Sequence, residues 1–340
     1  MNPPDELKHS QRPTRRQVLG AAGLLAVGCG VAAGGATWRR LERGQRATTF
    51  IARAIGYDAN LPRILASALD ELGLTRDRLR GKRVLLKPNL VETALGKQHI
   101  NTHPAVLVAA AEVLRQRDIA SIVVAEGQGH RRDSLLVLEE SGTQQALREA
   151  KLDFVDLNHD DVEAIPNAGG WTKLEKLYLP KTLLASDFIV SLPKLKTHHW
   201  AGVTCAMKNF FGVMPGLVYG WPKNVLHWHG IPQSILDINA TARPHFAIVD
   251  GIIGMEGDGP IMGTPKFAGC LIAGANLPAV DATAARVMGL NPNGVEYLRF
   301  GSGRLGPIYE TNIEQRGETI EALRSRFAIL DLTHLRGVAG

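Results

Sequence analysis

Cysteine is scarce in this sequence. Only Cys29, Cys205 and Cys270 occur in 340 residues, and no pair has the Cys-x-x-Cys spacing. Metal centres held by cysteine need several neighbouring thiolates, so neither a structural zinc site nor a cysteine-ligated iron–sulfur cluster is expected. A disulfide between Cys205 and Cys270 stays open as an alternative, although the apolar segment around Cys270 is typical of a buried strand.

A basic surface on the folded body is also lacking. The net charge is +6, but residues 1–46 hold eight basic and three acidic residues and so account for five of these charges. The rest of the chain is nearly neutral and has no run of lysines and arginines. A nucleic-acid-binding surface needs such a basic face, so we expect no nucleic-acid partner.

The N-terminus has the pattern of an export signal. Arg15 and Arg16 precede a weakly apolar, Gly/Ala-rich run over residues 18–36 that is short for a stable transmembrane helix. The arginine pair resembles a twin-arginine signal, which predicts the twin-arginine export machinery as a partner and a periplasmic or exported location. The alternatives are a simple membrane anchor and a lipid attached at Cys29. In each case only this segment contacts a membrane.

Apolar runs alternate with helical patterns from residue 82 onward. The strand candidates are residues 83–87, 119–125, 153–157, 187–192, 245–250 and 268–274. Helices are expected at 103–117, with Thr102 as a cap, at 134–150, led by Asp133, and at 277–290. This alternation predicts an α/β fold with a mostly parallel sheet and helices on both faces. We expect a signal or anchor at 1–40, a linker at 41–50 and the folded domain at 51–340, with a boundary to a second, smaller α/β lobe near 245.

Polar, glycine-rich segments directly follow four of these strands. They are KPNLVE (87–92), EGQGHRRDS (126–134), PKLKTHHWAG (193–202) and DGIIGMEGDGP (250–260). Ligands of open parallel sheets bind where such loops converge at the carboxyl ends of the strands. We therefore expect one site built from these four loops. The second loop lacks the GxGxxG pattern of a dinucleotide-binding fold.

Lysines dominate the predicted site. Lys87, Asn89, Arg131, Lys194, Lys196 and Lys208 are the candidates for binding an anionic molecule or cofactor. Lys208 lies between Met207 and Phe210, so we expect a poorly hydrated amine with a lowered pKa that acts as a base or links to a cofactor. Lys196 follows a Pro-Lys-Leu run, where we expect solvent access. The alternative is a solvated cationic loop that grips an anion without chemistry.

Histidines supply the candidate acid–base and metal-binding groups. His130 and His198 are candidate catalytic residues together with Lys208. His227 and His229 are one residue apart, and this spacing suits two metal ligands on one side of an extended segment, or one ligand and one residue that hydrogen-bonds to it. Asp250, Glu256, Asp258 and Asp281 form a scattered acidic set. Glu256 and Asp258 could bind a hard cation or pair with the lysines, and we favour pairing.

Four motifs, in order, carry a resemblance to a known family. They are KPNLV (87–91), PKLKTH (193–198) with Gly202 and Lys208-Asn209, GMEGDGP (254–260) and PAVDATAARVMGL (278–290). These segments resemble domain-of-unknown-function family 362 (DUF362) over roughly residues 80–300. That family has no settled activity. Many of its members carry ferredoxin-type cysteine motifs, which are absent here.

A second, partial resemblance is to the nickel-pincer lactate racemases. It rests on GQGHRR (127–132), HHWAG (198–202), Lys208, Pro215-Gly216 and His227 in the same order. The resemblance implies that His130 and His198 are proton-transferring bases, Lys208 anchors a nickel-containing organic cofactor, and His227 helps to hold the nickel or another divalent metal. The early phosphate-binding loop of those enzymes is replaced here by KPNLVE.

These observations predict an exported α/β enzyme that performs proton or hydride chemistry on an anionic small molecule, with an isomerase, racemase or oxidoreductase as the enzyme classes. The alternative is an exported, non-catalytic binding protein for an anionic ligand or a redox cofactor. A catalyst needs a positioned base beside the lysines, whereas a binding protein needs only the cations.

Overall fold

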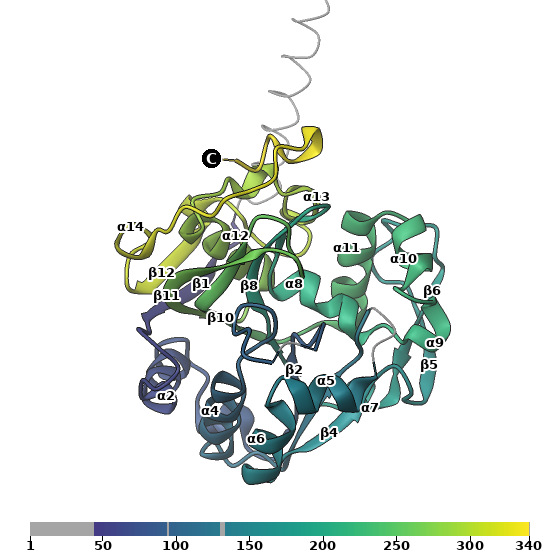
Figure 1. The fold of residues 1–340 in the computed structure, drawn as a ribbon. Helices are drawn as coiled ribbons and strands as arrows, with labels where there is room; N and C mark the ends of the chain where they lie inside the picture. Colours follow the sequence, from purple (N-terminus) through teal and green to yellow (C-terminus); the bar gives the residue numbers. More distant parts are fainter. Residues whose placement is uncertain (1–43, 94, 130–132, 340) are drawn as a thin grey trace, which may run out of the picture.

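One ten-stranded sheet runs through the protein (Figure 1). The computed structural model describes residues 44–93, 95–129 and 133–339. The strand order is β12-β1-β11-β10-β7-β2-β3-β4, and β8 and β9 join the sheet beside β10. The strands of this sheet are β1 (Ala47–Arg53), β2 (Arg83–Pro88), β3 (Ser121–Glu126), β4 (Asp153–Asp156), β7 (Phe188–Leu192), β8 (Lys194–His198), β9 (Gly202–Thr204), β10 (Phe246–Glu256), β11 (Thr264–Gly274) and β12 (Ile313–Gly317).

Helices connect and cover these strands. They are α2 (Leu61–Glu71), α3 (Arg76–Leu79), α4 (Pro104–Arg115), α5 (Ser134–Glu140), α6 (Thr143–Glu149), α7 (Lys181–Leu184), α8 (Ala206–Asn209), α9 (Gly216–Tyr219), α10 (Asn224–Trp228), α11 (Ile231–Ala242), α12 (Leu277–Val287), α13 (Glu296–Gly301) and α14 (Ile320–Leu323). Short 3₁₀ turns include η1 (Phe210–Val213). Within the described ranges, no helix is both long and apolar enough to cross a bilayer.

The middle of the sheet is parallel. Strands β10, β7, β2, β3 and β4 pair with their neighbours in parallel, whereas β11 is antiparallel to both β1 and β10. The α/β prediction with a mostly parallel sheet is therefore confirmed. Because the parallel strands share one direction, the segments that follow β2, β3 and β10 leave the sheet at the same edge.

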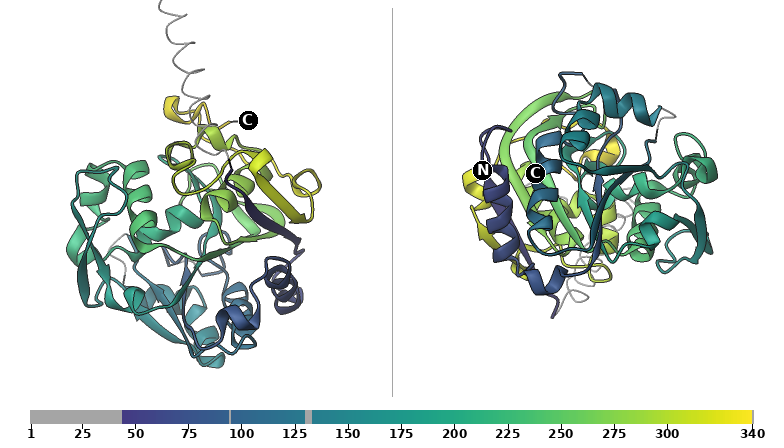
Figure 2. Two further views of the ribbon diagram at one scale, coloured as in Figure 1. Left: turned by 180° about the vertical axis from the view of Figure 1, so that it is seen from behind. Right: turned by 90° about the horizontal axis from the view of Figure 1, so that it is seen from below.

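Apolar side chains on both faces of the sheet hold the helices. In β2, Val84 and Leu86 pack into one buried cluster with residues of α2 and α4. Leu85 points the other way and packs with residues of α8, α11 and α12. Figure 2 shows these helices on opposite sides of the sheet. A strand buried on both faces has to be apolar throughout, which explains the continuous apolar run in β2.

A separate two-stranded sheet extends the fold at one side. It consists of β5 (Val162–Pro166) and β6 (Lys176–Pro180), which pair antiparallel. It lies beside α9 and α10 (Figure 1), and the backbone N–H of Tyr178 donates to the hydroxyl of Tyr219 at 2.8 Å.

Several boundaries differ from the sequence-based prediction. The helix expected over 134–150 is two helices, because Gly142 has a left-handed φ of 71° and ends the first one. His103, not Thr102, caps α4. Strand β1 begins at Ala47, so the expected linker 41–50 extends too far. A boundary to a second lobe was expected near residue 245. At that point β10 begins and pairs with β7 in the same sheet.

Two segments expected to be loops are strands. Residues 194–198 form β8, and residues 251–256 continue β10. The glycines and charged residues of these segments hid the strand pattern. The lysines of β8 can be buried in a strand because their partners are distant in the sequence. Both remaining cysteines are buried free thiols, so the alternative of a Cys205–Cys270 disulfide is wrong.

The carboxylate of Asp281 binds the N-terminus of the short helix α8. The carboxylate of this fully buried residue accepts hydrogen bonds from the N–H groups of Ala206 and Met207 at 2.7 and 3.1 Å and from the hydroxyl of Tyr297 at 3.1 Å. Burial raises the pKa of Asp281 to about 6, and these hydrogen bonds act against that rise. Asp281 therefore fixes the turn that carries Lys208 and Asn209.

We expect Asp281→Ala to destabilise the fold by at least about 3 kcal/mol, because three buried donors lose their acceptor. Urea unfolding followed by circular dichroism measures this loss. Asp258→Ala, at an exposed carboxylate, is the matched control and should change stability by less than about 1 kcal/mol. Equal effects of the two substitutions would show that Asp281 does not hold α8.

Candidate functional site

A cavity of about 290 Å³ opens at the carboxyl edge of the parallel strands. It is lined after β2 by Lys87 and residues 89–91, after β3 by residues 126–129, after β8 by residues 198–200, and after β10 by Pro260 and Ile261. The remaining lining comes from Thr204, Lys208, Asn209, Phe211, Gly212, Pro222, Lys223 and His227. Residues from all four polar segments singled out in the sequence therefore line one cavity. That this cavity is a binding site stays a prediction.

A buried ion pair forms the floor of this cavity. Lys87 Nζ lies 2.7 Å from the carboxylate of Glu126, and both side chains are buried. The same amine donates to Asn209 Oδ1 at 2.9 Å and to the carbonyl of Pro88 at 3.0 Å. An ammonium has three N–H groups, so Lys87 has none left for a ligand. Lys87 lies in the predicted site, but it builds the floor.

Gly212 lets the chain pass close to this pair. A Cβ atom at Gly212 would lie 2.1 Å from Glu126 Oε1 and 2.3 Å from Lys87 Nζ, far inside the contact distance. Any side chain here would separate the two charges or displace η1. The glycine is therefore required by the ion pair.

Three buried polar atoms in the cavity wall lack a hydrogen-bond partner. They are Asn89 Oδ1, Gln128 Nε2 and Thr204 Oγ1, and no described residue pairs with them. Their residues are at most 6% exposed, so bulk water reaches them poorly. Buried polar groups without partners are rare and unfavourable, so a bound water or a polar ligand would be stabilised at these three atoms.

Two further lysines give the cavity positive charge. Burial, and secondly the nearby charge of Lys87, lowers the pKa of Lys208 to about 8. Burial also lowers the pKa of Lys223 to about 7. Lys223 Nζ donates to the carbonyls of Gly127 and Phe211 at 2.7 and 3.0 Å. Since Glu126 is already paired with Lys87, protonated Lys208 and Lys223 favour an anion in the cavity.

His198 presents a hydrogen-bond donor to the cavity. Its Nδ1 accepts the N–H groups of Trp200 and Ala201 at 3.0 and 3.2 Å. The neutral ring therefore carries its proton on Nε2. Burial, and secondly the charge of Lys208, holds the pKa of His198 well below its usual value, so the ring stays neutral. The prediction that His198 acts as a base needs correction. Its Nδ1 is used by two backbone N–H groups, and its Nε2 already holds a proton.

His227 has the opposite tautomer. Its Nδ1 lies 3.0 Å from the carbonyl oxygen of Lys223 and must donate to it. In the neutral form of the ring, the lone pair would then be on Nε2. Trp200 packs edge-on against His227 and also lies close to His198, with ring centroids 5.7 and 6.4 Å away.

The His227–His229 pair does not converge on the cavity. The spacing of His227 and His229 suits two metal ligands on an extended segment. Instead, His227 lies in α10 and His229 follows directly as its C-cap. Residues two apart on a helix point in different directions, and only His227 lines the cavity. Among the residues that the structure describes, no three His, Cys, Asp or Glu side chains are grouped to hold a metal ion. The described donor set does not fit a nickel or other divalent metal centre.

Lys194 and Lys196 lie outside the cavity lining. Lys194 Nζ contacts Asp250 at 2.7 Å and the hydroxyl of Tyr57 at 2.7 Å. Lys196 Nζ donates to the carbonyls of Ile100 and Pro260 at 2.6 and 3.2 Å, and both lysines are fully buried. The expected solvent access of Lys196 is wrong, because β8 passes through the sheet interior.

The acidic residues take partners other than Lys208. Glu256 pairs with Lys266 at 3.4 Å, and Asp258 contacts His199 at 3.2 Å. The expected pairing with lysines of the predicted site is therefore not seen for Glu256 or Asp258. Asp250 pairs with Lys194, and Asp281 accepts hydrogen bonds from the α8 backbone.

Sequence reasoning missed Glu126, Gln128, Thr204 and Lys223. Gln128 and Glu126 belong to a loop that was singled out for its histidine and arginines. No local pattern marks Lys223 or Thr204. His130 and Arg131, which were predicted to be catalytic and cofactor-binding, lie outside the described residues.

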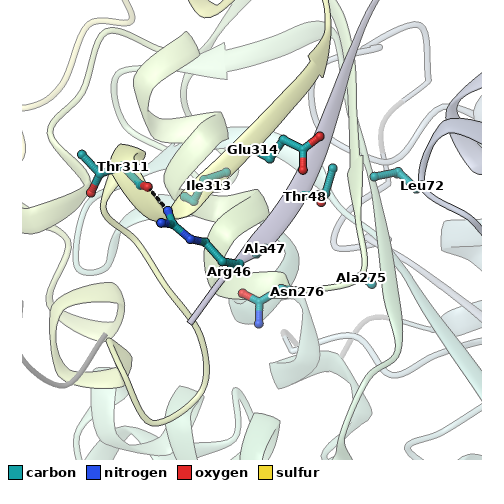
Figure 3. A pocket seen from close by; sticks show the side chains of 9 residues that line it. All are labelled: Arg46, Ala47, Thr48, Leu72, Ala275, Asn276, Thr311, Ile313 and Glu314. Atoms are coloured by element: carbon teal, nitrogen blue, oxygen red, sulfur yellow. Dashed lines mark hydrogen bonds between the residues drawn. The ribbon is translucent and has the colours of Figure 1, made fainter. Parts of the chain in front are cut away.

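A larger hollow, of about 680 Å³, lies at the other end of the sheet, between β1, β12 and the start of α12 (Figure 3). Its polar groups are already used within the protein. Arg46 donates to the carbonyl of Thr311, and Asn276 Oδ1 caps α12 by accepting the N–H of Ala279 at 3.0 Å. The described lining gives this hollow no comparable reason to bind a ligand.

Comparison with known proteins places the chain in a family. The family model of the domain of unknown function DUF362 matches residues 84–286. The chain belongs to the DUF362 family. A thylakoid-associated protein of Synechocystis sp. is 28% identical over 255 residues, which cover 71% of this chain and 74% of that protein.

Two solved structures share parts of the fold at low similarity. The lactate racemase apoprotein of Thermoanaerobacterium thermosaccharolyticum has a TM-score of 0.40 at 14% identity and covers 61% of this chain. A Thermotoga maritima protein has a TM-score of 0.36 at 12% identity and covers 66%. The matches span 50% and 57% of those two chains.

Two of the lysines that line this DUF362 cavity, Lys87 and Lys208, should differ in their contribution to stability. We expect Lys87→Ala to lower the free energy of unfolding by about 3–5 kcal/mol, because Glu126 is left buried and unpaired. Lys208→Ala removes no ion pair between described residues and should change stability by about 1 kcal/mol or less. Thermal and urea unfolding measure both. A loss for Lys208→Ala as large as that for Lys87→Ala would mean that Lys208 is a structural residue.

Proposed function

We propose that this protein is an enzyme that binds a small organic anion in the cavity at the carboxyl edge of the sheet and moves a proton to and from it. The observation that carries the proposal is the set of residues that line this cavity. Three unpartnered polar atoms, two lysines with lowered pKa values and two histidines in opposite tautomers line the same small space.

Each of these lining residues has its own role in the proposed reaction. Lys223 and Gln128 Nε2 bind the anionic group of the ligand. His227 Nε2 takes a proton from the carbon beside a carbonyl or carboxylate. The electron pair left behind moves onto the ligand oxygen, where the Nε2–H of His198 and the ammonium of Lys208 stabilise it. The same proton, or one from solvent, returns to the carbon, so no oxidant is needed.

The pairing of one donor and one acceptor histidine favours an enzyme over the non-catalytic binding protein. Binding an anion needs only the cations and the amide of Gln128. A histidine whose Nδ1 donates to a carbonyl, and whose Nε2 carries the lone pair when the ring is neutral, adds what proton transfer needs beside another histidine that holds its proton on Nε2. Hydride chemistry on the same ligand stays a prediction from the sequence.

Proton transfer is tested by exchange in D₂O. Small carboxylates with a C–H bond beside a carbonyl or carboxylate, such as pyruvate, are incubated with the protein, and loss of the proton signal is followed by NMR. We expect His227→Gln to slow exchange by at least about 100-fold. His198→Gln, which keeps an N–H donor, should be less impaired than His198→Ala.

His229→Gln is the matched control, since it changes a neighbouring histidine that does not line the cavity. Exchange that is equally fast in the wild type and in His227→Gln contradicts the enzyme proposal. If the wild type binds the anions but exchanges no proton in any of them, the binding-protein alternative holds.

Export is part of the proposal and rests on the twin-arginine pattern before residue 36. Residues 1–43 lie outside the described part of the chain. We expect replacement of Arg15 and Arg16 by lysine to retain the protein in the cytoplasm of its native host, because the export machinery recognises the arginine pair. Cell fractionation and immunoblotting measure this. An unchanged distribution would remove the twin-arginine route from the proposal.

A further inference from the structure

Lys208 is partly buried, and it differs from the four fully buried lysines in what its amine contacts. The amine of each of the other four has hydrogen-bond acceptors within the protein: Lys87 (Glu126, Asn209, Pro88), Lys194 (Asp250, Tyr57), Lys196 (Ile100, Pro260) and Lys223 (Gly127, Phe211). Among the described residues, Lys208 Nζ makes no hydrogen bond or salt bridge. It lies 4.2 Å from the centre of the Phe211 ring.

No carboxylate nearby is available to Lys208. Glu126 accepts hydrogen bonds from Lys87 and from the N–H of Leu90 through Oε2, and from the N–H of Gly127 through Oε1. The positive charge of Lys87 also lies close enough to lower the pKa of Lys208. The amine thus enters the cavity beside a fixed cation and without a counter-ion among the described residues.

These surroundings keep part of Lys208 uncharged at neutral pH. With a pKa of about 8, roughly a tenth of the molecules hold a free amine at pH 7, against roughly one in three thousand for an ordinary lysine. A free amine with an exposed lone pair is a nucleophile towards carbonyl carbon. Lys208 therefore has both the access and the protonation state for a covalent reaction.

We propose that Lys208 forms an imine with a small aldehyde or ketone that carries an anionic group, such as a 2-oxo acid. The inference rests on the function proposed above and names its substrate class. The anionic group is bound by Lys223 and Gln128 Nε2, which holds the carbonyl carbon beside Lys208 Nζ.

The reaction balances within the cavity. The lone pair of Lys208 attacks the carbonyl carbon and forms a C–N bond as the carbon–oxygen double bond becomes single. The nitrogen then loses a proton to solvent and the oxygen gains one from solvent, which gives a carbinolamine whose oxygen accepts a hydrogen bond from His198 Nε2–H. A further proton from solvent lets this hydroxyl leave as water, and a protonated imine remains. With a 2-oxo acid, the positive imine nitrogen takes the place of the Lys208 ammonium as the group that acidifies the neighbouring C–H, the proton that is removed in the proposed exchange.

Reductive trapping tests the imine directly. The full chain is incubated with pyruvate or glyoxylate and sodium cyanoborohydride, which reduces an imine to a stable secondary amine. Intact mass and peptide mapping then count and locate the adduct. We expect one adduct per chain, at Lys208, formed at least roughly tenfold faster than any adduct at the exposed Lys176. Its rate should rise between pH 7 and 8 as Lys208 loses its proton.

Two controls separate the imine from anion binding. Lys208→Arg keeps a positive charge but cannot form an imine, so it should still bind oxalate and give no adduct at the cavity. Oxalate, which has no aldehyde or ketone group, should slow trapping in the wild type by occupying the same space. The comparison of Lys208 with Lys176 within the wild type holds even where the variant folds poorly.

The outcomes distinguish this inference from the proposed function. Adducts spread evenly over surface lysines, or equal trapping in Lys208→Arg, overturn the imine. Oxalate binding without any adduct also overturns it and leaves the anion-binding proposal standing. Absence of both oxalate binding and adduct overturns the two together.

Discussion

The buried ion pair between Lys87 and Glu126 is the constraint on which the site depends. It joins the carboxyl ends of β2 and β3, and through Asn209 it also joins α8, so three segments that are distant in the sequence meet at 2.7–2.9 Å. A buried pair is stable only when its remaining hydrogen bonds are satisfied, and here they are. Because this pair occupies Glu126, the only carboxylate among the described residues of the lining, Lys208 and Lys223 have no counter-ion among those residues and favour an anion.

This arrangement also explains why the lysines of one motif have different roles. Lys194 and Lys196 alternate with apolar residues in β8 and are buried by Asp250, Tyr57 and backbone carbonyls. Lys208 follows on α8, where Asp281 fixes the backbone but no described side chain neutralises the amine. Lys194 and Lys196, which are buried with partners, hold the sheet together, whereas Lys208, without an acceptor among the described residues, lines the cavity, where we propose that it reacts.

Much of the fold and the place of the site could be predicted from the sequence. Apolar runs such as residues 187–192 mark central strands, and polar loops after them mark the carboxyl edge, because side-chain period and strand direction are local properties. The burial of Lys196 and the tautomer of His198 could not be predicted. The first depends on the carbonyls of Ile100 and Pro260, and the second on how the turn at Trp200 and Ala201 aims two N–H groups. Gln128 and Thr204 stand out only once their missing partners are known.

The central claim is that the cavity is completed by a small organic anion. A crystal structure of the protein grown with oxalate tests it most directly, because oxalate binds as an anion and cannot form the imine. The account predicts oxalate in the cavity, with its oxygens within hydrogen-bond distance of Gln128 Nε2, Lys223 Nζ and Lys208 Nζ. A cavity that holds only water at saturating oxalate, with those atoms bonded to protein groups instead, would contradict it.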